Sequence, residues 1–233
     1  MEKMTPPVPP RVRSSSTASI PSSTPHKIVF ALVGLPARGK SFIASKIVSF
    51  FNWSGTSARI FNAGSKRRDL EGAKTSGRST FFSNSNVSAV SKRDAIALAT
   101  LDEAINWLIN ENGCIALFDA TNTTQARRKL IEERLCQESQ SIKLIFIESI
   151  CTNEEVLRNN LLQKIRHSPD FDGIPEEDAL KDLRDRITAY ENVYEPVNDE
   201  EDVAYIKVID FHSKVCCLYF CIYFSLHYNI ACD

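Results

Sequence analysis

Apolar runs alternate with amphipathic stretches from residue 27 onward. The run KIVFALV at residues 27–33 is apolar after its first residue, which is typical of a strand buried on both faces of a sheet. Residues 40–51 instead repeat apolar side chains at helical intervals. By these criteria we expect strands at residues 27–33, 58–61, 114–118, 142–147 and 204–209, and helices at residues 40–51, 89–111, 124–137, 154–166 and 176–193. The alternation predicts an α/β domain with a mainly parallel sheet and helices on both faces.

One long polar segment interrupts this alternation between residues 62 and 88. It contains glycines and a series of basic residues, namely Lys66, Arg67, Arg68, Lys74 and Arg78. The segment follows a strand, and right-handed crossovers place the carboxyl ends of parallel strands along the edge of the sheet where ligands bind. We therefore interpret it as a mobile basic loop over the ligand, with a solvated surface excursion as the alternative.

The two ends of the chain differ from the middle. Residues 1–25 are rich in Pro, Ser and Thr and too poor in apolar residues to offset the entropy lost on ordering, so we expect disorder there. Residues 26–210 form the predicted domain. Residues 211–233 form a Cys-rich, aromatic tail without Asp, Glu, Lys or Arg between residues 215 and 232. Its cysteines and tyrosines disfavour a membrane anchor, so we expect it either to pack on the sheet or to stay unfolded.

Charge and cysteine usage narrow the class of protein. The formal net charge is -1 and the pI ≈ 6.4, which argues against nucleic-acid binding because that requires a basic face. No C-x-x-C pair occurs, and Cys114, Cys136 and Cys151 lie far apart, so we interpret the cysteines as reduced thiols of a cytoplasmic protein. The N-terminus lacks the apolar core of a secretory signal.

The sequence GLPARGKS lies between the first expected strand and the first expected helix, and it fits the phosphate-loop pattern G-x-x-x-x-G-K-[ST]. In such a loop, backbone N–H groups turn inward around phosphates and the helix dipole adds positive potential. Lys40 would reach the outer phosphates and Ser41 would bind Mg²⁺. The expected nucleotide-binding residues are Gly34, Leu35, Pro36, Ala37, Arg38, Gly39, Lys40 and Ser41. The α/β sheet is then that of a P-loop NTPase-type domain.

A phosphate loop requires an acidic partner at the end of a neighbouring strand. Asp119 directly follows the run CIALF at residues 114–118, so it is the candidate for metal binding or catalysis, with a helix N-cap as the alternative. A GTPase is disfavoured. The string DLEG at residues 69–72 matches D-x-x-G, but no strand precedes it and no N-K-x-D motif occurs.

The arginines indicate the charge of the second substrate. Arg67, Arg93, Arg127 and Arg186 fall beside the predicted ligand edge or on helices that lead from it. Planar guanidinium groups suit phosphates and carboxylates, so together they favour an anionic substrate. Each arginine taken alone is better explained as a solvated charge on a helix, so this inference needs support from further motifs.

That support comes from a set of strings spread over residues 27–210. They are GLPARGKS at 34–41, FNAGSKRRD at 61–69, FDATNTT at 118–124, ESIC at 148–151, SPDF at 168–171 and RITAYENVYE at 186–195. In combination they resemble the kinase domain of 6-phosphofructo-2-kinase/fructose-2,6-bisphosphatase, in a fungal-type form without the phosphatase domain. Other small-molecule P-loop kinases share only the first string.

The resemblance implies transfer of the ATP γ-phosphate to the 2-hydroxyl of fructose 6-phosphate, which gives fructose 2,6-bisphosphate, a regulator of glycolysis. The implied catalytic residues are Lys40, Asp119 and Cys151, although a packed thiol is the alternative for Cys151. Ser41 and Asp119 would bind Mg²⁺, and Asn160 would join the phosphate loop on the ATP side. The residues implied for fructose 6-phosphate are Arg67, Arg93, Thr121, Arg127, Arg186 and Tyr190.

The chain also departs from the family pattern. The family usually has a lysine three residues before its S-P-D motif, where this chain has Ile165 between Lys164 and Arg166. No R-H-G motif of a phosphatase domain occurs, and the residues after 210 differ from the strand and helix of the family. Two alternatives follow: a catalytically impaired relative that binds nucleotide or sugar phosphate in a regulatory role, and a different small-molecule P-loop kinase. A homodimer is a possible assembly, and a membrane partner is disfavoured.

Overall fold

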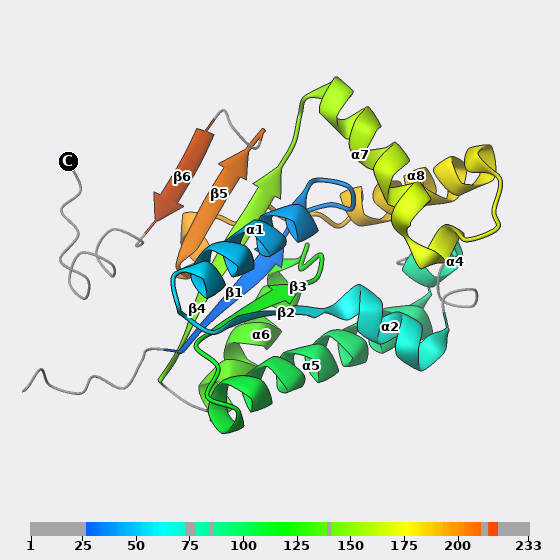
Figure 1. Cartoon of the computed structure of the whole chain (residues 1–233). Helices are drawn as coiled ribbons and strands as arrows, with labels where there is room; N and C mark the ends of the chain where they lie inside the picture. The colour runs from blue at the N-terminus through cyan, green and yellow to red at the C-terminus, as the bar shows by residue number, and fades with distance from the viewer. Residues whose placement is uncertain (1–26, 73–77, 84–85, 139–140, 211–213, 219–233) are drawn as a thin grey trace, which may run out of the picture.

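The computed structural model describes residues 27–72, 78–83, 86–138, 141–210 and 214–218 (Figure 1). The predicted disorder of residues 1–25 lies outside these ranges, as does most of the predicted tail. The division of the chain at residues 25 and 210 therefore stays a prediction. Within the described ranges, none of the helices has the length and apolar composition needed to cross a membrane.

Strands and helices alternate much as the hydrophobic pattern predicts. The strands are β1 (Lys27–Val33), β2 (Ala58–Asn62), β3 (Ile115–Asp119), β4 (Ile142–Ile150), β5 (Tyr205–Ile209) and β6 (Lys214–Leu218). The α-helices are α1 (Lys40–Trp53), α2 (Ala63–Glu71), α4 (Ser79–Phe82), α5 (Val87–Asn110), α6 (Gln125–Glu138), α7 (Glu154–His167) and α8 (Glu176–Glu191). Two short 3-10 helices are η1 (Pro169–Phe171) and η2 (Asp199–Glu201).

The strands form one sheet with the order β2-β3-β1-β4-β5-β6. Every pairing from β2 to β5 is parallel, and β6 pairs with β5 in the antiparallel direction. The predicted α/β fold with a mainly parallel sheet is therefore confirmed. The sequence pattern did not identify β6, which extends the sheet within the segment that we had set apart as a tail.

Helices cover both faces of the sheet, as predicted. Alternate residues of β1 point to opposite sides, so Val29 and Ala31 pack with residues of α5 and α6, whereas Phe30 and Leu32 pack with residues of α1. Figure 1 shows α1 lying across β1. Each buried Leu or Phe contributes roughly 1.5–3 kcal/mol to stability. The two clusters therefore hold the helices against the sheet and keep the carboxyl ends of the strands together at the ligand edge.

A third apolar cluster lies beyond the carboxyl ends of the strands, where α7, η1 and α8 pack together (Figure 1). Its buried members are Ile165, Phe171, Ala179, Leu183 and Ile187. Ile165, which occupies the position of a lysine in the family, is therefore a core residue of this cluster and does not face the ligand edge.

The prediction of an irregular loop at residues 62–88 is wrong for two stretches of it. Residues Ala63–Glu71 form α2, because the Asn62 side chain accepts a hydrogen bond from the Ser65 N–H and caps the helix. Residues Ser79–Phe82 form α4. Charged side chains conceal the helical pattern of α2, and Arg67 is its buried residue.

Candidate active site

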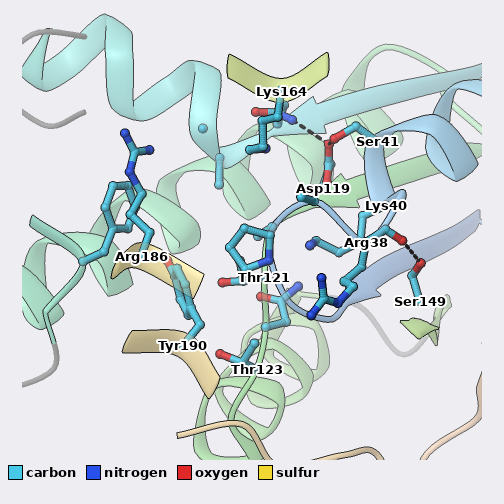
Figure 2. Close-up of a pocket in the computed structure, with 18 of the residues that line it drawn as sticks. Arg38, Lys40, Ser41, Asp119, Thr121, Thr123, Ser149, Lys164, Arg186 and Tyr190 are labelled. Atoms are coloured by element: carbon cyan, nitrogen blue, oxygen red, sulfur yellow. Dashed lines mark hydrogen bonds between the residues drawn. The ribbon is translucent and has the colours of Figure 1, made fainter. Parts of the chain in front are cut away.

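A cavity of about 1110 Å³ opens at the carboxyl ends of the parallel strands. Figure 2 shows Arg38 and Lys40 extending from the loop after β1, with Arg186 and Tyr190 on the facing side. The cavity is lined by most of the predicted site residues: Pro36, Ala37, Arg38, Gly39, Lys40, Ser41, Arg67, Arg93, Asp119, Thr121, Arg127, Cys151, Asn160, Arg186 and Tyr190. Gly34 and Leu35 belong to the same loop but do not line the cavity.

The loop after β1 has the backbone that a phosphate cradle requires. Gly34, Ala37 and Gly39 have φ angles of 133°, 61° and 86°, so the chain enters the left-handed region that favours glycine. A Cβ atom on Gly34 would lie 2.6 Å from the Ser149 carbonyl oxygen, which leaves no room for another residue there. Gly39 directly precedes α1, whose N-terminal N–H groups and dipole favour an anion.

Neighbouring elements hold this loop in place. The Ser149 hydroxyl at the end of β4 donates to the Arg38 carbonyl at 2.5 Å, as Figure 2 shows. The Asn160 side-chain amide of α7 donates to the Ala37 carbonyl at 3.1 Å. Asn160 therefore lies on the phosphate loop, where the resemblance placed it, and its contact in this structure is with the loop backbone.

Lys40 begins α1 and is nearly enclosed, with 8% of its surface exposed. Its Nζ donates to the Leu35 carbonyl at 2.6 Å. Burial lowers the pKa of Lys40 to about 7, and the charges of Lys164 and Arg38 act in the same direction, while Asp119 opposes them. Among the described residues, the group that accepts a hydrogen bond from Lys40 Nζ is thus a backbone carbonyl and not a carboxylate, so the ammonium group is suited to receive an anion.

Asp119 ends β3 and is buried beside the first turn of α1. Its Oδ2 accepts hydrogen bonds from the Ser41 hydroxyl at 2.7 Å and from the Asn62 amide at 2.6 Å (Figure 2). The two oxygen-bearing side chains proposed for Mg²⁺ therefore lie together, and oxygen ligands are those that Mg²⁺ prefers. Asn62, which pairs with Asp119 across β2 and β3, was missed because its strand is followed by the segment taken as a loop.

Lys164 supplies a cation that the sequence pattern had left in doubt. It lines the cavity (Figure 2), while its neighbour Ile165 is buried in the α7 and α8 cluster. Although Lys164 keeps solvent contact, the cavity walls remove enough water to lower its pKa; Asp119 opposes this effect, and Arg186 adds to it. The site therefore still has a lysine, which lies one residue before the position where the family has it.

Arg67 and Arg186 are buried and share a carboxylate, Asp170. Arg67 Nη2 donates to both Asp170 oxygens at 2.5 and 2.6 Å, and Arg186 Nη1 donates to Oδ2 at 3.0 Å. Burial alone would raise the pKa of Asp170, but the hydrogen bonds and charges of the two arginines hold it below its ordinary value. Figure 2 shows the Arg186 guanidinium turned away from Lys40. These two arginines therefore form a buried ionic cluster beside the cavity.

Arg93, Arg127 and Tyr190 form the other predicted substrate group. Arg127 pairs with Asp94, and burial lowers its pKa to about 10, with Tyr190 opposing and Arg93 reinforcing that shift. Arg93 donates to the Phe81 carbonyl at 2.6 Å, and burial likewise lowers its pKa. Arg127 remains cationic at neutral pH, because a pKa of about 10 lies well above it. The group therefore adds positive charge to the same cavity.

Cys151 follows β4 and lines the cavity. Partial burial raises the pKa of its thiol, the Asp210 charge adds to this shift, and a backbone hydrogen bond from Asn153 opposes it. A thiol with a raised pKa is mostly protonated at neutral pH, so this environment does not favour a nucleophilic role. Within the described ranges, Cys114, Cys136 and Cys151 are free thiols, as the sequence analysis expected.

The segment between Asp119 and α6 is fixed by the buried side chain of Arg128. Its Nε and Nη2 both donate to Glu201 at 2.6 Å, and its Nη1 donates to the Asn122 carbonyl at 3.2 Å and the Glu195 carbonyl at 2.9 Å. The Asn122 amide donates in turn to the Leu32 carbonyl of β1 at 2.8 Å. This network ties the loop that carries Thr121 to the strand that carries the phosphate loop.

Several residues of the site were not predicted. They are Asn62, Phe82, Ser149, Lys164 and Asp170. Asn62 and Ser149 lie in or beside quoted motifs at strand ends, which is the signal that could have identified them. Asp170 lies in the quoted string SPDF, but its pairing with Arg67 depends on how α7 and η1 pack over the sheet, as does the place of Lys164 at the cavity.

Comparison with known proteins identifies relatives of this chain. A family model described as 6-phosphofructo-2-kinase matches residues 15–223. A probable 6-phosphofructo-2-kinase of Schizosaccharomyces pombe is 40% identical over 195 residues, which cover 82% of this chain and 32% of that protein. The 6-phosphofructo-2-kinase 1 of Saccharomyces cerevisiae is 37% identical over 216 residues, which cover 88% of this chain and 26% of that protein. Among solved structures, a fungal RNA kinase aligns with a TM-score of 0.48 and 16% identity over 78% of this chain and 74% of that chain.

The chain thus spans 32% and 26% of the lengths of these two curated relatives. The matched region of this chain contains the phosphate loop, Asp119 and both arginine groups. Since the family model covers most of the chain and the relatives exceed a third in sequence identity, the resemblance seen in the motifs is confirmed. This chain belongs to the 6-phosphofructo-2-kinase family.

Proposed function

We propose that this chain transfers the γ-phosphate of ATP to the 2-hydroxyl of fructose 6-phosphate and so makes fructose 2,6-bisphosphate. The observation that carries the proposal is the shared cavity, in which a phosphate loop with Lys40 faces a wall that bears Arg186 and Tyr190 (Figure 2). A nucleotide and a sugar phosphate bound on these two sides would meet near Asp119. Membership of the 6-phosphofructo-2-kinase family supports this choice of substrates.

The residues present fit the groups that this reaction requires. The loop after β1 has positive φ angles at Ala37 and Gly39 and leads into the N-terminus of α1, and Ser41 and Asp119 offer neighbouring oxygen atoms for Mg²⁺. Ser41 and Asp119 would hold Mg²⁺, which would supply positive charge to stabilise the transferring phosphoryl group. Lys40, which is nearly buried and hydrogen-bonded to a backbone carbonyl, would exchange that carbonyl for a phosphate oxygen.

In the proposed reaction, the sugar 2-oxygen forms a bond with the γ-phosphorus while the bond to the bridging oxygen of ADP breaks. The hydroxyl proton passes to the Asp119 carboxylate and then to solvent. Phosphoryl transfer requires little covalent participation by protein, so positioning and positive charge provide most of the acceleration. Lys40, Lys164 and Arg127 would supply that charge from different walls of the cavity.

The decisive experiment measures transfer of ³²P from γ-labelled ATP to fructose 6-phosphate. Wild-type protein should form labelled fructose 2,6-bisphosphate, and the Lys40→Met and Asp119→Asn variants should form little of it. Asp119→Asn should lower turnover by roughly 10²- to 10⁴-fold, as loss of a general base does. Product formation by wild type that does not exceed that of Lys40→Met would refute the proposal.

Two further assays on the same protein distinguish this function from two alternatives. Calorimetric binding of a non-hydrolysable ATP analogue without transfer would indicate a regulatory, nucleotide-binding relative. The turn of Arg186 away from Lys40 is the observation that favours this second function. Faster transfer to gluconate or shikimate than to fructose 6-phosphate in a competition assay would indicate a different small-molecule kinase.

A further inference from the structure

An aromatic side chain outside the predicted site lies among the arginines. The ring centroid of Phe82, the last residue of α4, is 5.2 Å from the guanidinium carbon of Arg67 and 4.6 Å from that of Arg186. It is also 6.0 Å from the ring centroid of Tyr190. Phe82 is partly buried and lines the cavity. One ring therefore contacts three of the side chains that the resemblance assigns to the sugar phosphate.

The helix that carries Phe82 is held by polar contacts with the same group of residues. At its start, Asp182 Oδ1 accepts the N–H of Ser79 at 2.7 Å, while Asp182 Oδ2 accepts Arg186 Nε at 2.9 Å. Near its end, Arg93 Nη1 donates to the Phe81 carbonyl at 2.6 Å. No residue of α4 is fully buried. The arginine group and its carboxylate partner therefore hold both ends of this helix.

We propose that Phe82 is a positioning residue for the sugar phosphate, because its ring fixes the guanidinium planes of Arg67 and Arg186 and the ring of Tyr190. The inference rests on the proposed function. It adds a residue from the segment first taken as a mobile loop, and it assigns α4 a role in substrate affinity.

The physical basis is the electrostatic shape of an aromatic ring. A guanidinium group within about 6 Å of a ring centroid is attracted to the negative face of the ring by roughly 0.5–2 kcal/mol, more when water is excluded. An arginine held in this way has lost part of its rotamer freedom before substrate arrives, so less entropy is lost when it binds a phosphate. A leucine at the same position fills similar space but lacks the negative face.

The experiment compares Phe82→Leu with Phe82→Tyr, which keeps the ring. Initial rates are measured with fructose 6-phosphate varied at saturating Mg·ATP, and then with Mg·ATP varied at saturating sugar phosphate. Phe82→Leu should raise KM for fructose 6-phosphate about 3- to 30-fold, which is the range that corresponds to one cation–π contact. Its KM for ATP should stay within about twofold of wild type, and Phe82→Tyr should resemble wild type in both.

Phe50→Leu is the matched control, because Phe50 is an exposed aromatic residue of α1 that does not line the cavity. An unchanged KM for fructose 6-phosphate in Phe82→Leu would overturn the inference. Equal rises in both KM values, or the same defect in Phe82→Tyr, would overturn it as well, because either result indicates a general loss of structure.

The two proposals fail in different ways. If wild type forms no fructose 2,6-bisphosphate, the proposed function is refuted, and the role of Phe82 is then tested by calorimetric titration with inorganic phosphate. Weaker phosphate binding by Phe82→Leu than by Phe82→Tyr would support the role, and equal binding would refute it. If wild type is active and Phe82→Leu keeps its KM, only the inference about Phe82 is wrong.

Discussion

Nucleotide binding should be accompanied by proton uptake at Lys40. In the free protein, burial lowers the pKa of this ammonium group from the ordinary 10.5 to about 7. Phosphate oxygens at the same place favour the charged form, so binding should return the pKa toward 10.5. A group whose pKa rises on binding strengthens the complex at low pH, and this contribution is lost as pH rises above the pKa of the free protein.

The magnitude follows from the two pKa values. With a free pKa of about 7, only about a tenth of the protein carries a charged Lys40 at pH 8, so binding should take up about 0.9 proton there. The apparent Kd should rise as the fraction of free protein with a charged Lys40 falls. Between pH 7.5 and pH 9 this fraction falls about 25-fold, so the apparent Kd should rise about 25-fold. Both pH values lie above the last phosphate pKa of ATP, so the nucleotide itself adds little to the change.

Isothermal titration calorimetry provides the measurement. A non-hydrolysable ATP analogue with Mg²⁺ is titrated into the protein at pH 8 in buffers of different ionisation enthalpy, and the slope of the observed enthalpy gives the protons bound. Lys40→Arg keeps a permanent charge, so its slope should fall close to zero. A wild-type slope near zero, or a Kd that does not change up to pH 9, would refute the assignment of a lowered pKa to Lys40.

Further substitutions test the residues that position the phosphate loop and the walls of the cavity. Gly34→Ala should abolish analogue binding in the same titration, because a Cβ atom there would lie 2.6 Å from a backbone carbonyl oxygen; normal affinity would contradict this. Arg128→Met leaves the Glu201 carboxylate buried without its partner and should lower the free energy of unfolding by about 3–5 kcal/mol in urea. The double variant with Glu201→Met should lose less than the sum of the two single losses. Lys164→Met should raise KM for fructose 6-phosphate with little change in unfolding, whereas Ile165→Lys should chiefly lower the urea midpoint, since it buries a charge in the α7 and α8 cluster. The opposite pattern would reverse the roles assigned to these two neighbours.

Local patterns in the sequence predicted the alternating strands and helices of the fold, and they predicted the phosphate loop and Asp119 in the candidate site. The run that became β1 is apolar after Lys27, and the glycines of the phosphate loop have a fixed spacing, so both can be recognised without knowledge of tertiary contacts. Asp119 was found because a polar residue at the end of a buried strand meets other strand ends at one edge of a parallel sheet. Each of these inferences starts from the residue types and spacing within one short segment of the sequence.

The other half of the site depends on contacts between distant segments. Asp170 lies 103 residues after Arg67, and nothing near either residue indicates that they form a buried pair. The helix α2 was taken for a loop because its charged residues hide the side that faces inward. The strand β6 was missed because its partner, the edge of β5, is created only when the sheet assembles.

The carboxylate of Asp170 also acts as a built-in counter-ion. Arginines that face solvent recruit anions from the buffer, and a ligand that displaces those anions binds with an affinity that depends strongly on salt. Arg67 and Arg186 are already paired within the protein, both with Asp170 and Arg186 also with Asp182, and these carboxylates cannot diffuse away. The fold thereby shields part of this cavity from the ionic strength of its surroundings.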